Sequence, residues 1–138
     1  MLEPSQTMPP PEYSLMPAGP FSRLTGPYYV LTTDTKYSLL INIEHMHLNR
    51  GQSVHGGMLL AISDNANVGA AEAQAGGAMV STVSLHCDFI GMAGRGRLEA
   101  TGWVNRRTSA LIFTSGEIRV RGNLVMTSTG IFKVLGAK

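Results

Sequence analysis

The sequence predicts an α+β fold in which an antiparallel β-sheet wraps around one long central α-helix. Two observations carry this prediction. An Ala-rich apolar stripe at helical spacing covers residues 57–75, and runs that read as β-strands lie on both sides of it. The element order is β-β-α-β-β-β-β, in a chain of 138 residues, a length that suits one compact domain.

The N-terminal segment differs in composition from the rest. Residues 1–20 contain six of the seven prolines of the chain. Proline fixes φ and removes a backbone donor, so we expect this segment to be a poorly ordered arm. We expect a short turn at residues 21–26, and we take residues 21–138 as a single domain.

The first predicted strands form a hairpin before the helix. Residues 28–33 and 36–44 are rich in Tyr, Leu, Ile and Val, and the break between them falls at Asp34-Thr35. The helix that follows is predicted to end at Gly76-Gly77, because glycine is the usual residue just past a helix C-terminus.

Four strands are predicted after the helix, and their short breaks favour antiparallel neighbours. In the first of them, one face carries Val83, Leu85, Cys87 and Phe89 and the other carries Thr82, Ser84, His86 and Asp88. The remaining strands cover residues 95–105, 109–120 and 123–135. Gly102, Gly116 and Gly130 fall within them, which indicates either room for the helix or flexible, bulged strands. The whole arrangement is that of the hotdog fold.

Composition limits the possible partners. Hydrophobic residues make up 43% and charged residues 14%, which predicts apolar area buried between subunits. The net charge of +2 without a basic run argues against nucleic acid. The single cysteine, Cys87, favours the cytoplasm and a packing role for its thiol. We find no stretch of about 20 apolar residues and no signal-peptide layout, and we therefore expect no membrane association and no export.

A polar segment precedes the predicted helix. Asn49 is followed by His55-Gly56-Gly57, and Asp64 lies nine residues after His55. This joint pattern resembles the hotdog thioesterase superfamily, in particular the phenylacetate-degradation (PaaI-like) type and relatives that cleave 4-hydroxybenzoyl-CoA and medium or long acyl-CoA. The resemblance covers residue 21 to the end of the chain. It implies hydrolysis of an aryl- or fatty-acyl-CoA thioester to the free acid and CoA, without a cofactor.

The resemblance also implies roles for individual residues. Asp64 matches the catalytic carboxylate, acting as general base or nucleophile, and Gly56 matches the backbone N–H that polarises the thioester carbonyl. Thr82 matches the hydroxyl that helps hold the attacking water. Asn49 and His55 match polar positions that line the same site. We assign substrate binding to the following residues: Gly57, Met58, Ser81, Arg95 and Arg97.

Elementary chemistry supports these roles. Free N–H groups at a helix N-terminus can stabilise the oxyanion that forms when a thioester is attacked, and glycine lets a substrate approach them. Asp64 lies among apolar and small residues, where a carboxylate is costly unless it is paired, hydrated or functional. The alternatives are an ordinary turn at Gly56-Gly57 and a solvent-facing or backbone-bonded Asp64.

Several other polar residues have simpler interpretations. His55 could be a base, a donor to the carbonyl or a helix cap, and Asn65 and Asn67 could serve only as surface positions. His45 and His47 share a face of a predicted strand but have no third ligand, so we predict no metal site. Arg95 and Arg97, with Arg106 and Arg107, could contact the phosphates of CoA or form a solvated basic rim. Met46 and Met58 are candidate pocket walls.

Helix geometry predicts a shared site. Gly56 and Asp64 are eight residues apart in sequence, hence ~12 Å apart along the helix axis and ~80° around it. One thioester cannot contact both, so the donor and the carboxylate should come from different subunits of a homodimer or of a homotetramer made of two dimers. Two rivals remain open: a hotdog hydratase or dehydratase, and a non-catalytic acyl-CoA-binding protein.

Overall fold

The computed structural model describes residues 8–136 of the chain. Its helices are α2 (Pro20–Thr25), the short 3-10 helix η1 (His45–His47) and α3 (Gly56–Gln74). Its strands are β1 (Ser14–Leu15), β2 (Tyr29–Thr32), β3 (Tyr37–Ile43), β4 (Val80–Phe89), β5 (Gly96–Arg107), β6 (Leu111–Val120) and β7 (Asn123–Val134).

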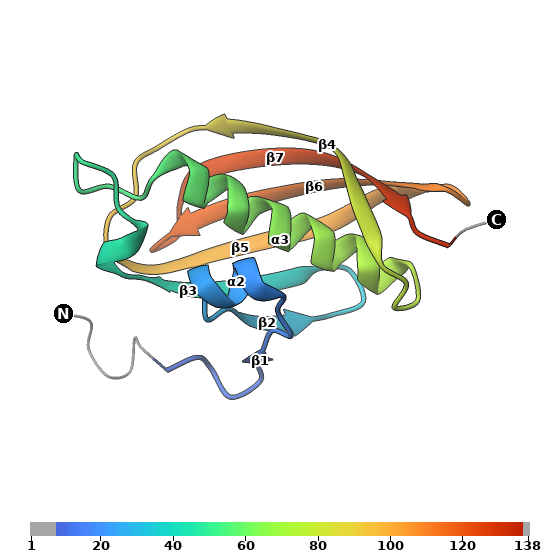
Figure 1. Cartoon of the computed structure of the whole chain (residues 1–138), viewed down its shortest axis with the longest axis horizontal. Helices are drawn as coiled ribbons and strands as arrows, with labels where there is room; N and C mark the ends of the chain where they lie inside the picture. The colour runs from blue at the N-terminus through green and yellow to red at the C-terminus, as the bar shows by residue number, and fades with distance from the viewer. Residues whose placement is uncertain (1–7, 137–138) are drawn as a thin grey trace.

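The strands form one antiparallel sheet in the order β1-β2-β3-β5-β6-β7-β4. Figure 1 shows α3 lying along one face of this curved sheet. The predicted α+β hotdog architecture, with its element order, is therefore confirmed for the six long strands and the central helix. Within the described residues, none of the helices is long and apolar enough to cross a membrane.

The core lies between α3 and the sheet. Ile62 on the helix is fully buried, as are Leu39 and Leu98 on the strands beneath it. Each such side chain contributes about 1.5–3 kcal/mol by leaving water. The helix comes very close to β5, since a Cβ at Gly102 would lie 2.4 Å from the carbonyl oxygen of Ala66.

The three strand glycines have different surroundings. The expected room for the helix is confirmed at Gly102. At Gly116 a Cβ would meet both the sheet and the Nδ2 of Asn67 on α3, 3.0 Å away. At Gly130 the crowding comes from Phe132 and Thr114 of the sheet, so the helix is not the reason for that glycine.

The ends of α3 follow from local sequence. At its N-terminus the Nδ1 of His55 accepts a hydrogen bond from the Gly57 N–H, 2.9 Å away, and so caps the helix. Past its C-terminus Gly76 and Gly77 have φ of 67° and 86°, a conformation that costs glycine least. The predicted stop is confirmed.

The N-terminal region differs from its prediction. Residues 1–7 lie outside the described residues, and within the rest of the expected arm Ser14–Leu15 pairs with β2. The expected turn at residues 21–26 is the helix α2, which begins at Pro20, where a fixed φ suits the first helical position.

The prediction that His45 and His47 share a face of a strand is also wrong. Strand β3 ends at Ile43, and His45 and His47 lie on η1. His47 is buried, its Nδ1 accepts from the Glu44 N–H at 2.9 Å, and its Nε2 lies 2.6 Å from the Thr25 carbonyl oxygen. The first contact caps η1 itself, and the second joins η1 to the end of α2. Sequence periodicity could not show the contact with Thr25, because it links residues 22 positions apart.

Candidate active site

The first turn of α3 presents a backbone donor. The Gly57 N–H donates to the side chain of His55, whereas in the described part of the chain the Gly56 N–H makes no hydrogen bond. A Cβ at Gly56 would lie 3.5 Å from the ring of Phe89, an ordinary van der Waals contact, so Phe89 of β4 is the nearest neighbour on that side of the glycine. The positive end of the helix dipole adds to the field at this N–H, which suits an oxyanion.

The second component lies two turns further along α3. The Thr82 hydroxyl donates to Oδ1 of Asp64 over 3.0 Å, across from β4 to the helix. Asp64 is half-buried, and burial raises the pKa of its carboxyl while the hydrogen bond from Thr82 lowers it. A carboxylate with a raised pKa is a stronger base than one in water, and it keeps one oxygen for a further contact.

A β-bulge decides the direction of Thr82. The period-two pattern placed Thr82 on the face opposite Leu85 and Cys87, but Thr82 contacts Asp64 on α3 and Cys87 contacts Ser63 of the same helix. The pairing of β4 with β7 shifts register between Thr82 and Ser84. The extra residue, Val83, turns the preceding side chain over to the helix face, as bulges beside active sites commonly do.

Asn67 is not the surface residue that the sequence suggested. It is fully buried, its Nδ2 donates to the Ser128 hydroxyl at 2.9 Å, and its Oδ1 accepts from the Thr114 hydroxyl at 2.7 Å. The signal in the sequence was its spacing, since Ser63, Asn67 and Ala71 recur every four residues on the buried side of the helix. This network anchors α3 to β6 and β7 one turn from Asp64.

Asn49 organises the loop before the helix. Its Oδ1 accepts from the backbone N–H groups of Gly51 at 2.9 Å and Ser53 at 3.2 Å. The loop is then held by the Val54 N–H, which donates to the Ala93 carbonyl at 2.7 Å. Asn49 thus fixes the backbone that leads into α3, and no hydrogen bond joins its side chain to Asp64 among the described residues.

The residues assigned to substrate binding are spread over the molecule. Gly57 and Met58 line a cavity beside α3, and Arg95 lies exposed just before β5, at the helix N-terminal end of the sheet. Ser81 is exposed on β4 opposite Lys133. Arg97 contacts the Met8 carbonyl and lies on the sheet face that points away from α3. The structure therefore does not bring Arg97 to the helix.

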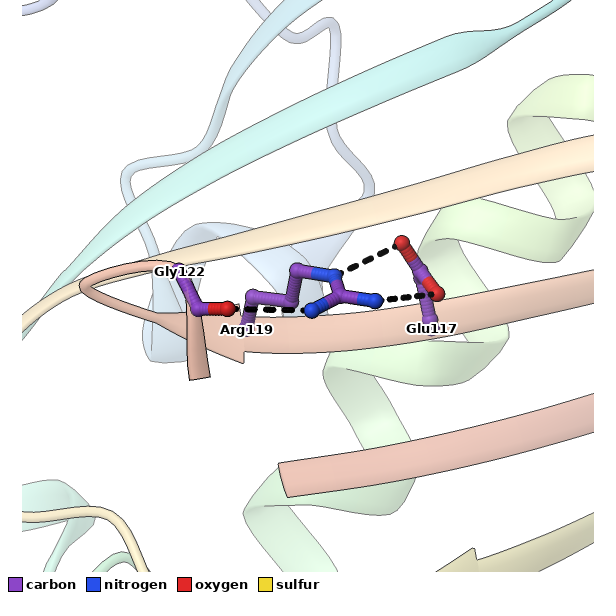
Figure 2. A network of polar contacts seen from close by, with 3 residues as sticks. All are labelled: Glu117, Arg119 and Gly122. Carbon is purple, nitrogen blue, oxygen red and sulfur yellow. Dashed lines mark hydrogen bonds and ion pairs between the residues drawn. The ribbon is translucent and has the colours of Figure 1, made fainter. Parts of the chain in front are cut away.

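The outer face of the sheet carries its own polar network. Figure 2 shows Arg119 donating to both oxygens of Glu117, at 2.9 and 3.3 Å, and to the Gly122 carbonyl at 3.0 Å. The Glu117 hydrogen bonds raise the pKa of Arg119. Glu117 alternates with the buried Ile118, so this ion pair is separated from Asp64 by the sheet. Among residues 8–136, no three His, Cys, Asp or Glu side chains gather at one point.

Comparisons with known proteins agree on one family. The model of the thioesterase superfamily matches residues 51–127, which include Gly56, Asp64 and Thr82. The Pseudomonas aeruginosa protein named "Putative esterase PA0474" is 30% identical over an alignment of 125 residues that covers 86% of this chain and 90% of that protein.

Solved structures share the fold. The phenylacetic acid degradation-related protein of Ralstonia eutropha has a TM-score of 0.75 and 27% identity, over 86% of this chain and 92% of that one. A point mutant of the phenylacetic acid degradation protein PaaI of Thermus thermophilus has a TM-score of 0.76 and 24% identity, over 85% of this chain and 100% of that one.

Proposed function

The chain belongs to the thioesterase superfamily, and from this premise we propose that it hydrolyses an acyl-CoA thioester to a free acid and CoA. The observation that carries the proposal is the contact between Asp64 and Thr82, 3.0 Å long, on the helix whose first N–H is open. A base with a raised pKa and a separate oxyanion donor are the two groups that thioester hydrolysis needs.

The reaction needs little else from the protein. As general base, Asp64 takes a proton from a water held with the help of Thr82, and the water oxygen bonds to the thioester carbon. The carbonyl electron pair is held at the Gly56 N–H, then returns and breaks the C–S bond. The CoA thiolate leaves readily and takes up the proton, because a thiol has a pKa of only ~8.5. As nucleophile, Asp64 would instead form an anhydride that water hydrolyses.

The surface around the site supports a subunit partner. Strand β4 is an edge of the sheet, and its side chains Val83 and Phe89 are 60% and 54% exposed. Leu60, which lies one helical turn before Asp64 on α3, is 40% exposed. An edge strand with an apolar surface is stabilised by pairing with another copy. The pairing would bring Gly56 of one protomer to Asp64 of its partner, in a dimer or a dimer of dimers.

Hydrolysis of a panel of acyl-CoA thioesters, followed by release of free thiol, tests the activity. We expect turnover for at least one acyl class. Esters of the same acids without CoA should not be hydrolysed at comparable rates. Hydration of an enoyl-CoA without thiol release would identify a hydratase instead. Binding of acyl-CoA without either reaction would identify a non-catalytic protein.

Mixing two inactive variants tests the shared site. In a mixed dimer of Asp64→Asn and Gly56→Val, one site carries both changes and the other neither. With random exchange about a quarter of the wild-type activity should return, because half the dimers are mixed and each has one intact site. If mass spectrometry shows exchange and no activity returns, each subunit must contain a complete site.

A further inference from the structure

A cavity of about 420 Å³ lies beside the first two turns of α3, between that helix, α2 and η1. Its walls are apolar: Phe21 and Leu24 come from α2, Met46 from η1, and Met58 and Ala61 from α3. Phe21, Leu24 and Met46 are 63%, 73% and 62% exposed, which is unusual for three large apolar side chains that face one hollow.

We propose that this cavity binds the acyl chain of the thioester, and that it selects unsubstituted, flexible apolar chains over acyl groups that end in a hydroxyl or a charge. This inference rests on the proposed hydrolase function and names its substrate class. The volume falls in the range of about 300–1,000 Å³ that is usual for small-molecule sites.

The position of the cavity connects it to the reacting bond. Gly57 and His55 line the cavity, and they are the chain neighbours of Gly56, whose N–H is open. A carbonyl oxygen held at Gly56 therefore places the acyl carbon at the mouth of the cavity, with the attached chain free to enter. The acyl chain would leave water when the thioester binds, so the burial of that acyl chain would help to position the carbonyl.

Most polar side-chain atoms that line the cavity are already used, and this determines the selectivity. Both ring nitrogens of His47 are engaged, by the Glu44 N–H and the Thr25 carbonyl. The Thr25 hydroxyl lies 2.7 Å from that of Tyr28, and Nδ1 of His55 caps α3. Nε2 of His55 is the exception, since it makes no hydrogen bond among the described residues, but His55 adjoins Gly56, where the carbonyl is held. A hydroxyl or carboxylate carried further in by the acyl chain would lose its water without finding a side-chain partner, which is costly.

Two of the walls can adapt to chains of different length. Met46 and Met58 are unbranched and have a polarizable sulfur, so they can fill or vacate space with little strain. We expect kcat/KM to rise ~4-fold for each added methylene until the cavity is full, which is the gain from burying one CH₂. Aryl groups with a polar para substituent should be poorer substrates than their unsubstituted counterparts.

Filling the cavity tests the proposal kinetically. Ala61→Phe places a ring in the hollow, and Leu24→Lys places a charge at its mouth without touching the core. Both should lower the ratio of kcat/KM for octanoyl-CoA to that for acetyl-CoA by at least tenfold. Ala73→Phe, an exposed alanine on the same helix, is the matched control and should leave the ratio within about twofold. Unchanged ratios in both variants, with thiol release intact, would overturn the proposed role of the cavity and would leave the proposed hydrolase activity unaffected.

A binding measurement makes the test independent of activity. Methyl-labelled methionines give one NMR signal each, and titration with a non-hydrolysable octanoyl-CoA thioether should shift Met46 and Met58 and leave Met79 and Met126 unchanged. This holds even if no thioester is hydrolysed, so failure of the function and failure of the cavity are distinguishable. Shifts confined to other methionines would overturn the proposal. So would shifts of Met46 and Met58 that depend on protein concentration without ligand, because they would show that a second copy of the chain occupies the cavity.

Discussion

Asp64 and Asn67 lie three residues apart on α3, but their polar surroundings differ. Asn67 is fully buried and bonds to Ser128 and Thr114, so both ends of its amide are used. Asp64 is half-buried, accepts one hydrogen bond from Thr82, and keeps part of its carboxylate open to solvent. A satisfied buried group holds the helix in register, whereas an under-coordinated carboxylate can still bind water or substrate. Neighbouring turns of α3 thus carry an anchoring residue, Asn67, and the residue that we propose as the catalytic carboxylate, Asp64.

The largest effect should come from removing the charge at Asp64. Asp64→Asn keeps the shape of the side chain and can still accept from Thr82, but it is neither a base nor a nucleophile. Turnover should fall by at least ~10² with substrate binding largely retained. Steady-state kinetics on the best acyl-CoA measures this. Activity within a few-fold of wild type would remove Asp64 from the mechanism.

Removing the amide at Asn67 should instead affect stability. Asn67→Leu leaves the hydroxyls of Thr114 and Ser128 buried without their partner and should lower the free energy of unfolding by about 2–4 kcal/mol. Urea denaturation measures the change. Asn65→Leu is the control, because Asn65 is only half-buried and its hydrogen bonds with Ser22 are long, at 3.3 and 3.5 Å. Equal losses in both variants would contradict the anchoring role.

Thr82→Ala should have a smaller kinetic effect and a characteristic pH dependence. A positioning hydroxyl contributes about 0.5–1.5 kcal/mol, so kcat should fall about two- to tenfold. Activity needs the ionised Asp64 and is lost as pH falls through its raised pKa. The Thr82 bond lowers that pKa, so its removal should move the acid limb of the kcat profile to higher pH. A shift to lower pH would mean that Thr82 does not stabilise the carboxylate.

The smallest effect concerns stability against pH. Because burial raises the pKa of Asp64 in the folded state, folding favours its protonated form, and this contribution to stability is lost as pH rises through the folded pKa. Asp64→Asn should therefore be more stable than wild type at pH 7, by less than ~1 kcal/mol since solvent screens a half-buried group. Thermal melts should show the difference vanish below pH ~3.9, the pKa of an unfolded aspartate.

The sequence alone determined the elements whose pattern is local. The small-residue stripe predicted α3, observed at Gly56–Gln74. Residue composition predicted β2 and β3, and alternation predicted the four strands after the helix. The joint pattern of Asn49, His55-Gly56-Gly57 and Asp64 carried the family resemblance that marked Asp64 and Gly56 as candidate site residues, and the setting of a carboxylate on an apolar helix supported it. These features depend on neighbours within a few residues, which periodicity reads directly.

Tertiary structure decided what depends on how distant segments meet. The bulge at Val83 turned Thr82 towards Asp64 only because β4 pairs with β7 in one register. Asn67 is buried because Thr114 and Ser128, 47 and 61 residues away, arrive opposite it. The apolar cavity exists because η1 and α2 pack beside α3, joined through His47. Each outcome rests on pairing between residues far apart in the chain, and a pattern of near neighbours carries no information about that pairing.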